Sequence, residues 1–271
     1  MPRRPLPHSA EDEPINRPRL KDVKTEALLR SVERGSVTHI ARMSAFERYP
    51  GDSHDGAIVL RSVLRLLDAE LSPTRPSPLG STPGPQLQET LQRILGWMDI
   101  VCISIRKINE KDTAMLATFT GIYKENLHVV LRWLRFYMGE ARWAFTWQFP
   151  AADMVAPKVV IETLHNMHTV CKSDDFRATM HTSGDVIDLL LSVWLWQDRH
   201  ENAMYLTYPP EKSGGKYALD PTIHLFAEFC LDRKSQFLVW EKVFALTGRE
   251  QIGSIKPPPT LSRTCEGLIA R

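Results

Sequence analysis

Two histidines and a cysteine recur at helical spacing late in the chain, and such side chains can share a zinc ion. They are His165, His168 and Cys171, and imidazole nitrogens and thiolates are zinc ligands. On one helix, however, the two outer side chains diverge by about 120°, and no fourth ligand is indicated. Cys171 also continues an apolar stripe. We therefore predict no metal site and no cofactor.

A His-Asp pair offers a different chemistry. All-helical metal-dependent phosphohydrolases of the HD type use such a pair with a further His and Asp, and His54 and Asp55 resemble it, with His39 upstream. No downstream residue stands out as the final Asp. Near the start of a helix, Asp52 and Asp55 are instead typical capping residues that also suit the helix dipole. We favour the capping interpretation and keep the phosphohydrolase as an alternative.

A cationic stripe follows one helical face. Lys124, His128, Arg132 and Arg135 recur at spacings of four, four and three, and Trp133 lies at the edge of the stripe. Basic groups beside aromatic rings can hold phosphate or an acidic segment of a partner. A solvated outer face explains the same pattern without any ligand.

Two further tryptophans, Trp143 and Trp147, lie in a less regular stretch where a short extended segment is conceivable. Partly exposed tryptophans are frequent anchors of protein contacts. Together with the stripe, they form the partner-binding surface that the sequence predicts.

The sequence lacks the common short signatures of catalysis. It has no phosphate-binding glycine loop, no G-x-S-x-G elbow, no C-x-x-C pair and no H-E-x-x-H helix. We therefore expect no catalytic residues and predict that the protein is not an enzyme.

Apolar side chains recur every three to four residues along most of the chain, which indicates amphipathic helices. The helix at 86–110 is apolar on all sides, so it is predicted to be central. Helices are expected at about 21–34, 53–71, 86–110, 114–122, 124–139, 157–172, 185–197, 221–231 and 235–247.

Proline separates these helices, because it lacks a backbone donor and clashes inside a helix. Fifteen of the 19 prolines fall at 2–18, 73–85, 209–210 and 257–259. The sequence therefore predicts a disordered tail at 1–20, a helical domain at 21–250 with a proline-rich linker at 72–85, and a second disordered tail at 251–271.

Composition limits the compartment and the partners. The chain has 271 residues, 43% of them apolar, and 34 Lys and Arg against 32 Asp and Glu. A formal charge of +2 makes nucleic acid an improbable partner, leaving a weak contact through the basic helix face as a further alternative. With four scattered cysteines, no secretory signal and no apolar run long enough to cross a bilayer, we expect an intracellular protein, cytoplasmic or nuclear, without a membrane span.

Short connections between helices favour an all-α fold of antiparallel helical hairpins, stacked as an irregular armadillo- or HEAT-like array or as a bundle. The segment FRATMHTSGDVIDLLLSVWLWQD at 176–198, with VVLRWLRFYM and LVWEKVFALTG, resembles the helical region of fungal proteins that often end in a MYND-type zinc finger. The resemblance implies an armadillo-like array used for protein contacts. The clustered Cys and His ligands of the finger are absent from this sequence, so no zinc-binding function is implied. The predicted function is a protein-interaction or scaffolding module.

Overall fold

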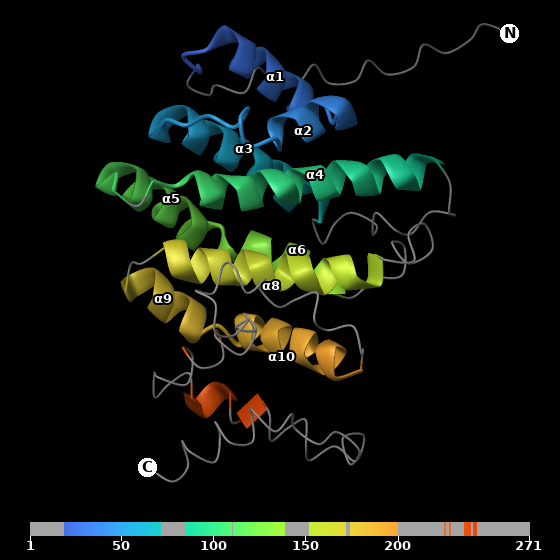
Figure 1. Cartoon of the computed structure of the whole chain (residues 1–271), viewed down its shortest axis with the longest axis vertical. Coiled ribbons are helices and arrows are strands. Elements are labelled where there is room, and N and C mark those ends of the chain that lie inside the picture. The colour runs from blue at the N-terminus through green and yellow to red at the C-terminus, as the bar shows by residue number, and fades with distance from the viewer. Residues whose placement is uncertain are drawn as a thin grey trace, which may run out of the picture.

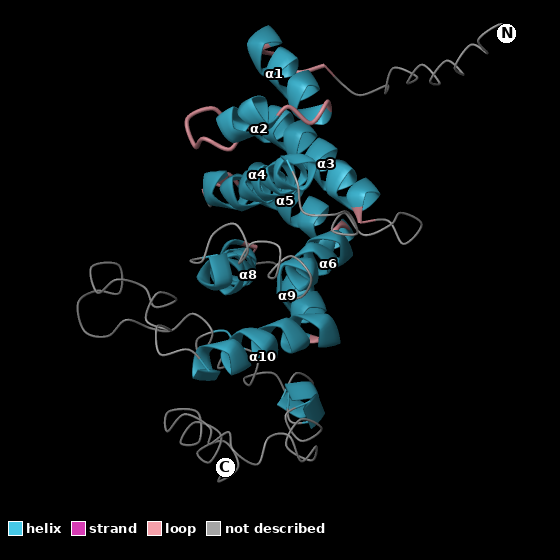
Figure 2. Cartoon of the chain, turned by 90° about the vertical axis from the view of Figure 1, so that its right-hand side faces the viewer, coloured by secondary structure: helices cyan, strands magenta, loops and turns pink. Residues whose placement is uncertain are grey.

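The part of the chain that the computed structural model describes is built of α-helices, and none of its residues lies in a strand (Figure 2). The all-α prediction is confirmed. The described residues are 19–71, 85–109, 111–138, 152–171, 174–199, 225, 228, 236–239 and 241–242. The predicted C-terminal tail, residues 1–18 of the predicted N-terminal tail and residues 72–84 of the predicted linker lie outside them.

The described helices are labelled as in Figure 1. They are α1 (Val23–Glu33), α2 (Val37–Met43), α3 (Ser53–Glu70), α4 (Pro85–Lys107), α5 (Thr113–Glu125), α6 (Leu127–Met138), α8 (Ala152–Val170), α9 (Asp174–His181) and α10 (Gly184–Arg199).

Short polar side chains fix where several helices begin. Asp52 accepts a hydrogen bond from the Asp55 amide at 2.9 Å at the start of α3, and Asp112 accepts one from the Met115 amide at the start of α5. These contacts satisfy amides that have no partner within the helix. Gly35 follows α1 with a φ of 78°, a backbone conformation that glycine adopts without strain.

The helices are stacked along the longest axis of the molecule, and the views of Figures 1 and 2 agree on their order. α1 packs on α2, α3 on α4, and α6 on α8. Between these pairs, α1 contacts α3 and α3 contacts α6, while α2 contacts α4 and α4 contacts α8. Each pair therefore rests on the next, and α10 covers both α6 and α8.

The central position of α4 follows from its sequence. Leu91, Ile94, Trp97, Ile100 and Val101 point in different directions around the helix, and all are buried. Neighbours on several sides cover them, because α4 contacts α2, α3 and α8. The prediction of a central helix is confirmed.

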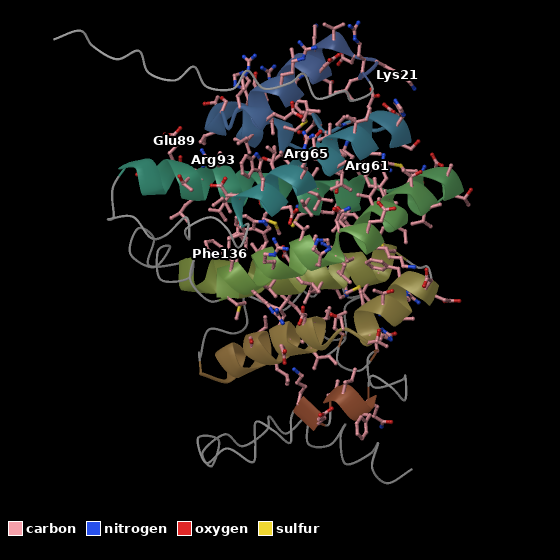
Figure 3. The ribbon with its side chains drawn as sticks, turned by 180° about the vertical axis from the view of Figure 1, so that it is seen from behind. Lys21, Arg61, Arg65, Glu89, Arg93 and Phe136 are labelled. Atoms are coloured by element: carbon pink, nitrogen blue, oxygen red, sulfur yellow. The ribbon has the colours of Figure 1, made fainter. Side chains whose placement is uncertain are left out.

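Ion pairs join neighbouring helices at the surface. Arg65 of α3 lies 3.6 Å from the Glu33 carboxylate of α1, and Arg93 of α4 lies 3.4 Å from that of Glu70. Figure 3 shows both arginines from behind. The Arg93 guanidinium also lies over the Trp97 ring, 5.6 Å from its centroid. Such partly exposed pairs add little stability individually.

The structure differs from the sequence-based expectations in several places. α2 and α9 were not predicted, and Leu20, assigned to the N-terminal tail, is buried in the core. Among the described residues, no helix combines the length and the apolar character that crossing a bilayer requires.

Candidate functional site

The predicted cationic stripe is divided between two helices. Lys124 lies in the last turn of α5, whereas His128, Arg132 and Arg135 belong to α6. Asn126 separates them, since it is the C-cap of α5 and its side chain donates to the Ile122 carbonyl at 2.8 Å. The continuous helix predicted at 124–139 was therefore wrong at its start.

The cations of the stripe meet carboxylates of other helices. Lys124 pairs with Asp175 of α9, and Arg135 pairs with Asp185 of α10. Arg132 lies 3.0 Å from Asp68 of α3. His128 is exposed on α6. Three of the four basic residues thus connect neighbouring helices within the chain.

Trp133 is a core residue rather than the edge of a surface. Its side chain is 0% exposed, and its indole nitrogen donates to the Leu67 carbonyl of α3 at 2.8 Å. Its ring meets Phe136 edge to face, with centroids 5.3 Å apart. Trp133 is therefore not available to a partner. The other two tryptophans of the predicted surface, Trp143 and Trp147, lie outside the described residues.

The histidine cluster on α8 is arranged differently from a metal site. His168 is buried, and its Nε2 lies 3.0 Å from the Nε2 of His181 on α9. Burial raises the pKa of the Cys171 thiol to about 11, so this cysteine keeps its proton at neutral pH. Nowhere in the described ranges do three His, Cys, Asp or Glu side chains form a group able to hold a metal ion.

The His-Asp pair of the phosphohydrolase alternative is likewise divided between different environments. His54 is exposed, whereas Asp55 is buried and accepts a hydrogen bond from the Lys21 amide at 3.2 Å. The Nδ1 of His39 lies 2.7 Å from the Ser36 hydroxyl at the start of α2. Asp52 has the predicted capping role at the start of α3, whereas the buried Asp55 carboxylate accepts from the Lys21 amide instead of capping the helix.

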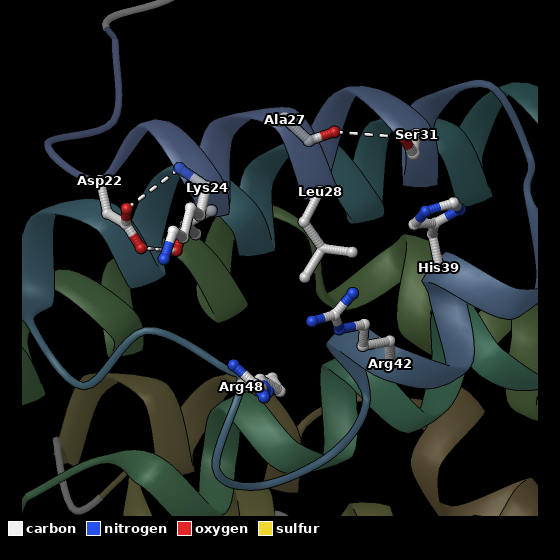
Figure 4. A pocket seen from close by; sticks show the side chains of 9 residues that line it. Asp22, Lys24, Ala27, Leu28, Ser31, His39, Arg42 and Arg48 are labelled. Carbon is white, nitrogen blue, oxygen red and sulfur yellow. Dashed lines mark hydrogen bonds between the residues drawn. The ribbon is translucent and has the colours of Figure 1, made fainter.

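A pocket of about 360 Å³ opens between α1, α2 and the segment that leads to α3 (Figure 4). α1 provides one wall through its exposed side, and α2 with the following turn provides the other. The residues that line it are Asp22, Lys24, Thr25, Ala27, Leu28, Ser31, His39, Arg42 and Arg48.

The pocket is basic, because three cationic side chains and one carboxylate line it. Asp22 is already engaged as the N-cap of α1. It accepts from the Thr25 hydroxyl at 2.8 Å and from the Lys24 amide at 3.0 Å, and these hydrogen bonds lower the pKa of its carboxyl. Within the described part of the chain, neither Arg42 nor Arg48 forms an ion pair.

Apolar side chains adjoin the pocket. Val23 precedes Lys24 and is 77% exposed, and Phe46 lies between Arg42 and Arg48 in the sequence and is 49% exposed. The Lys107 ammonium lies 3.9 Å from the centroid of the Phe46 ring. Of the three exposed large apolar side chains in the described residues, two are therefore close in sequence to residues that line this basic pocket. Exposed apolar side chains among polar ones are frequent in protein-contact surfaces.

The wall formed by α2 depends on a close approach to α4. Ile40 is fully buried, and a Cβ added at Gly96 would lie 2.3 Å from its Cγ2. Only a residue without a side chain allows α2 to lie this close. The pocket was not predicted from the sequence because α2 was not predicted, although Val37, Ile40 and Met43 recur at helical spacing after Ser36.

Comparison of the chain with family models, with curated proteins and with solved structures finds no match.

Proposed function

We propose that this protein is an interaction module, a stacked array of helical pairs of the armadillo or HEAT kind that binds a partner protein at its α1–α2 end. The observation that carries the proposal is the surface around the pocket. Arg42 and Arg48, which form no ion pair among the described residues, occur there together with exposed apolar side chains.

The packing order supports the array. In helical-repeat proteins each pair of helices contacts only its neighbours, and the stack presents an extended surface to its ligands. Here α1 and α2, α3 and α4, and α6 and α8 form successive pairs in contact. The resemblance of 176–198 to the armadillo-like region of fungal MYND-type proteins favours the same kind of role.

Nucleic-acid binding receives less support than protein binding. Arg132 and Arg135, which carried that alternative, are paired with Asp68 and Asp185. A nucleic-acid surface needs several cations free to neutralise phosphates. No observation among the described residues favours the phosphohydrolase.

Quantitative co-purification from the native cell tests the proposal. The double variant Val23→Ser/Phe46→Ser removes the two exposed apolar side chains close in sequence to pocket residues, and Phe237→Ser removes a side chain of intermediate exposure, 64% accessible. Residues 236–239, 241 and 242, drawn in red-orange in Figure 1, lie at the opposite end of the stack, so Phe237→Ser is a matched control.

We expect partner proteins recovered with the wild type to be retained by Phe237→Ser and depleted at least about tenfold by the double variant, as for loss of an interface anchor. Equal recovery with the double variant would contradict binding at the α1–α2 end.

A further inference from the structure

The chemistry of the pocket between α1 and α2 specifies the kind of partner segment. We infer that it receives a carboxylate side chain from an acidic peptide segment whose apolar residues lie against Val23 and Phe46. This inference rests on the proposed function and names the ligand class of the same surface.

The first step is the charge of the pocket. Lys24, Arg42 and Arg48 outnumber the single carboxylate of Asp22, and Asp22 already accepts two hydrogen bonds from α1. Guanidinium groups present planar, forked donors that match a carboxylate in two parallel hydrogen bonds. An anionic group is therefore the complementary ligand.

The second step is the size of the pocket and its neighbours. About 360 Å³ is at the lower end of the volumes that hold small ligands, which suits one or two side chains rather than a whole helix. The exposed ring of Phe46 and the exposed methyl groups of Val23 would add nothing to the binding of a free inorganic anion. They would add affinity for a peptide, because burying apolar area is favourable.

The third step separates a carboxylate from a phosphate. Lys24, Arg42 and Arg48 outnumber the single carboxylate of Asp22, so the charge of the pocket attracts both anions. A carboxylate is the anionic side chain that a peptide carries without any modification. The acidic peptide is the favoured source of the anion.

Fluorescence anisotropy with the full chain tests the inference. The probe is a short fluorescein-labelled peptide that alternates glutamate with leucine, compared with its glutamine counterpart, with a phosphoserine counterpart and with inorganic phosphate as competitor. The binding variant is Arg42→Ala/Arg48→Ala. The matched control is Arg132→Ala/Arg135→Ala, which removes two arginines that pair within the chain.

We expect the glutamate peptide to bind more tightly than the glutamine peptide, and we expect its affinity to fall with added salt. Its Kd should rise about tenfold or more in Arg42→Ala/Arg48→Ala and stay within about twofold of the wild type in the control. Thermal unfolding of both variants checks that each is folded.

Equal binding of the glutamine peptide, or an unchanged Kd in Arg42→Ala/Arg48→Ala, would overturn the inference. Tighter binding of the phosphoserine peptide, or full competition by millimolar inorganic phosphate, would overturn the choice of a carboxylate peptide. If the glutamate peptide does not bind while Val23→Ser/Phe46→Ser still depletes partners on co-purification, the ligand class is wrong and the interaction module stands. If the peptide binds and co-purification is unaffected, the proposed function fails instead.

Discussion

The basic pocket and the cationic stripe contain the same residue types in different circumstances. Arg132 and Arg135 of the stripe lie beside Asp68 and Asp185. Arg42 of α2 and the nearby Arg48 line a pocket whose one carboxylate already caps α1. The difference teaches that a cation is available to a partner only where the packing of the other helices leaves it without a carboxylate.

The largest expected effect concerns the helix that carries most of the stripe. Trp133→Ala should lower the free energy of unfolding by about 3–5 kcal/mol, because it leaves a cavity in the core. Trp133→Phe should cost about 1–3 kcal/mol, since it leaves a smaller cavity and removes the indole hydrogen bond to the Leu67 carbonyl, which keeps only the Leu71 amide as donor. Urea unfolding measures both.

His128→Ala, an exposed change on the same helix, is the control for Trp133 and should stay within about 0.5 kcal/mol of the wild type. A Trp133→Ala variant as stable as this control would mean that the tryptophan is exposed in the folded protein. The α6 helix would then again be a candidate for partner binding.

The next effect tests the support of the pocket. Gly96→Ala should destabilise the protein by about 1–3 kcal/mol, because its Cβ would overlap Ile40 of α2. Gly121→Ala in α5 meets nothing within 4 Å and should stabilise the protein by up to about 1 kcal/mol through helix propensity. Calorimetry or urea unfolding compares the two.

Because α2 carries Arg42 and His39, Gly96→Ala should also weaken binding of the glutamate peptide, whereas Gly121→Ala should leave it unchanged. A Gly96→Ala variant with unchanged stability would mean that α2 and α4 do not pack as closely as described.

A smaller effect depends on pH and tests how well Cys171 is buried. Burial raises the pKa of the Cys171 thiol to about 11. The folded chain therefore keeps this proton where the unfolded chain loses it. The resulting stability is fully present below about pH 9 and is lost as the pH rises towards 11.

Between about pH 8 and pH 10 the loss attributable to Cys171 should be about 1 kcal/mol. Urea unfolding of the wild type and of Cys171→Ala at both pH values isolates it, because the variant should lose less stability over the same interval. Identical losses would show that the thiol is accessible to water in the folded protein.

The sequence predicted the long helices well and the short ones poorly. Four leucines at regular spacing predicted 53–71, and α3 runs from Ser53 to Glu70. α2 and α9 have seven and eight residues, too few turns for a periodicity to stand out from noise. The boundary between α5 and α6 was missed because Asn126 interrupts no apolar stripe and only its capping geometry ends the helix.

The site was less predictable than the fold because its properties depend on distant residues. Arg132 and Asp68 are 64 positions apart, and Lys124 and Asp175 are 51 apart. The partner of His168 is His181 on the next helix, whereas spacing within one helix had suggested His165 and Cys171. The spacing of cations along a helix can be read from the sequence. Which of them are neutralised depends on the carboxylates that the tertiary packing brings close.

The smallest expected effect gives the most direct test of the contrast between the stripe and the pocket. The free energy of unfolding should be measured for Arg132→Ala/Arg135→Ala and Arg42→Ala/Arg48→Ala at low and high salt. We expect the stripe variant to lose about 0.2–1 kcal/mol per ion pair at low salt and less at high salt, as partly exposed pairs do. The pocket variant should keep the stability of the wild type, because its arginines have no carboxylate partners in the described chain. A larger loss in the pocket variant than in the stripe variant would contradict the account.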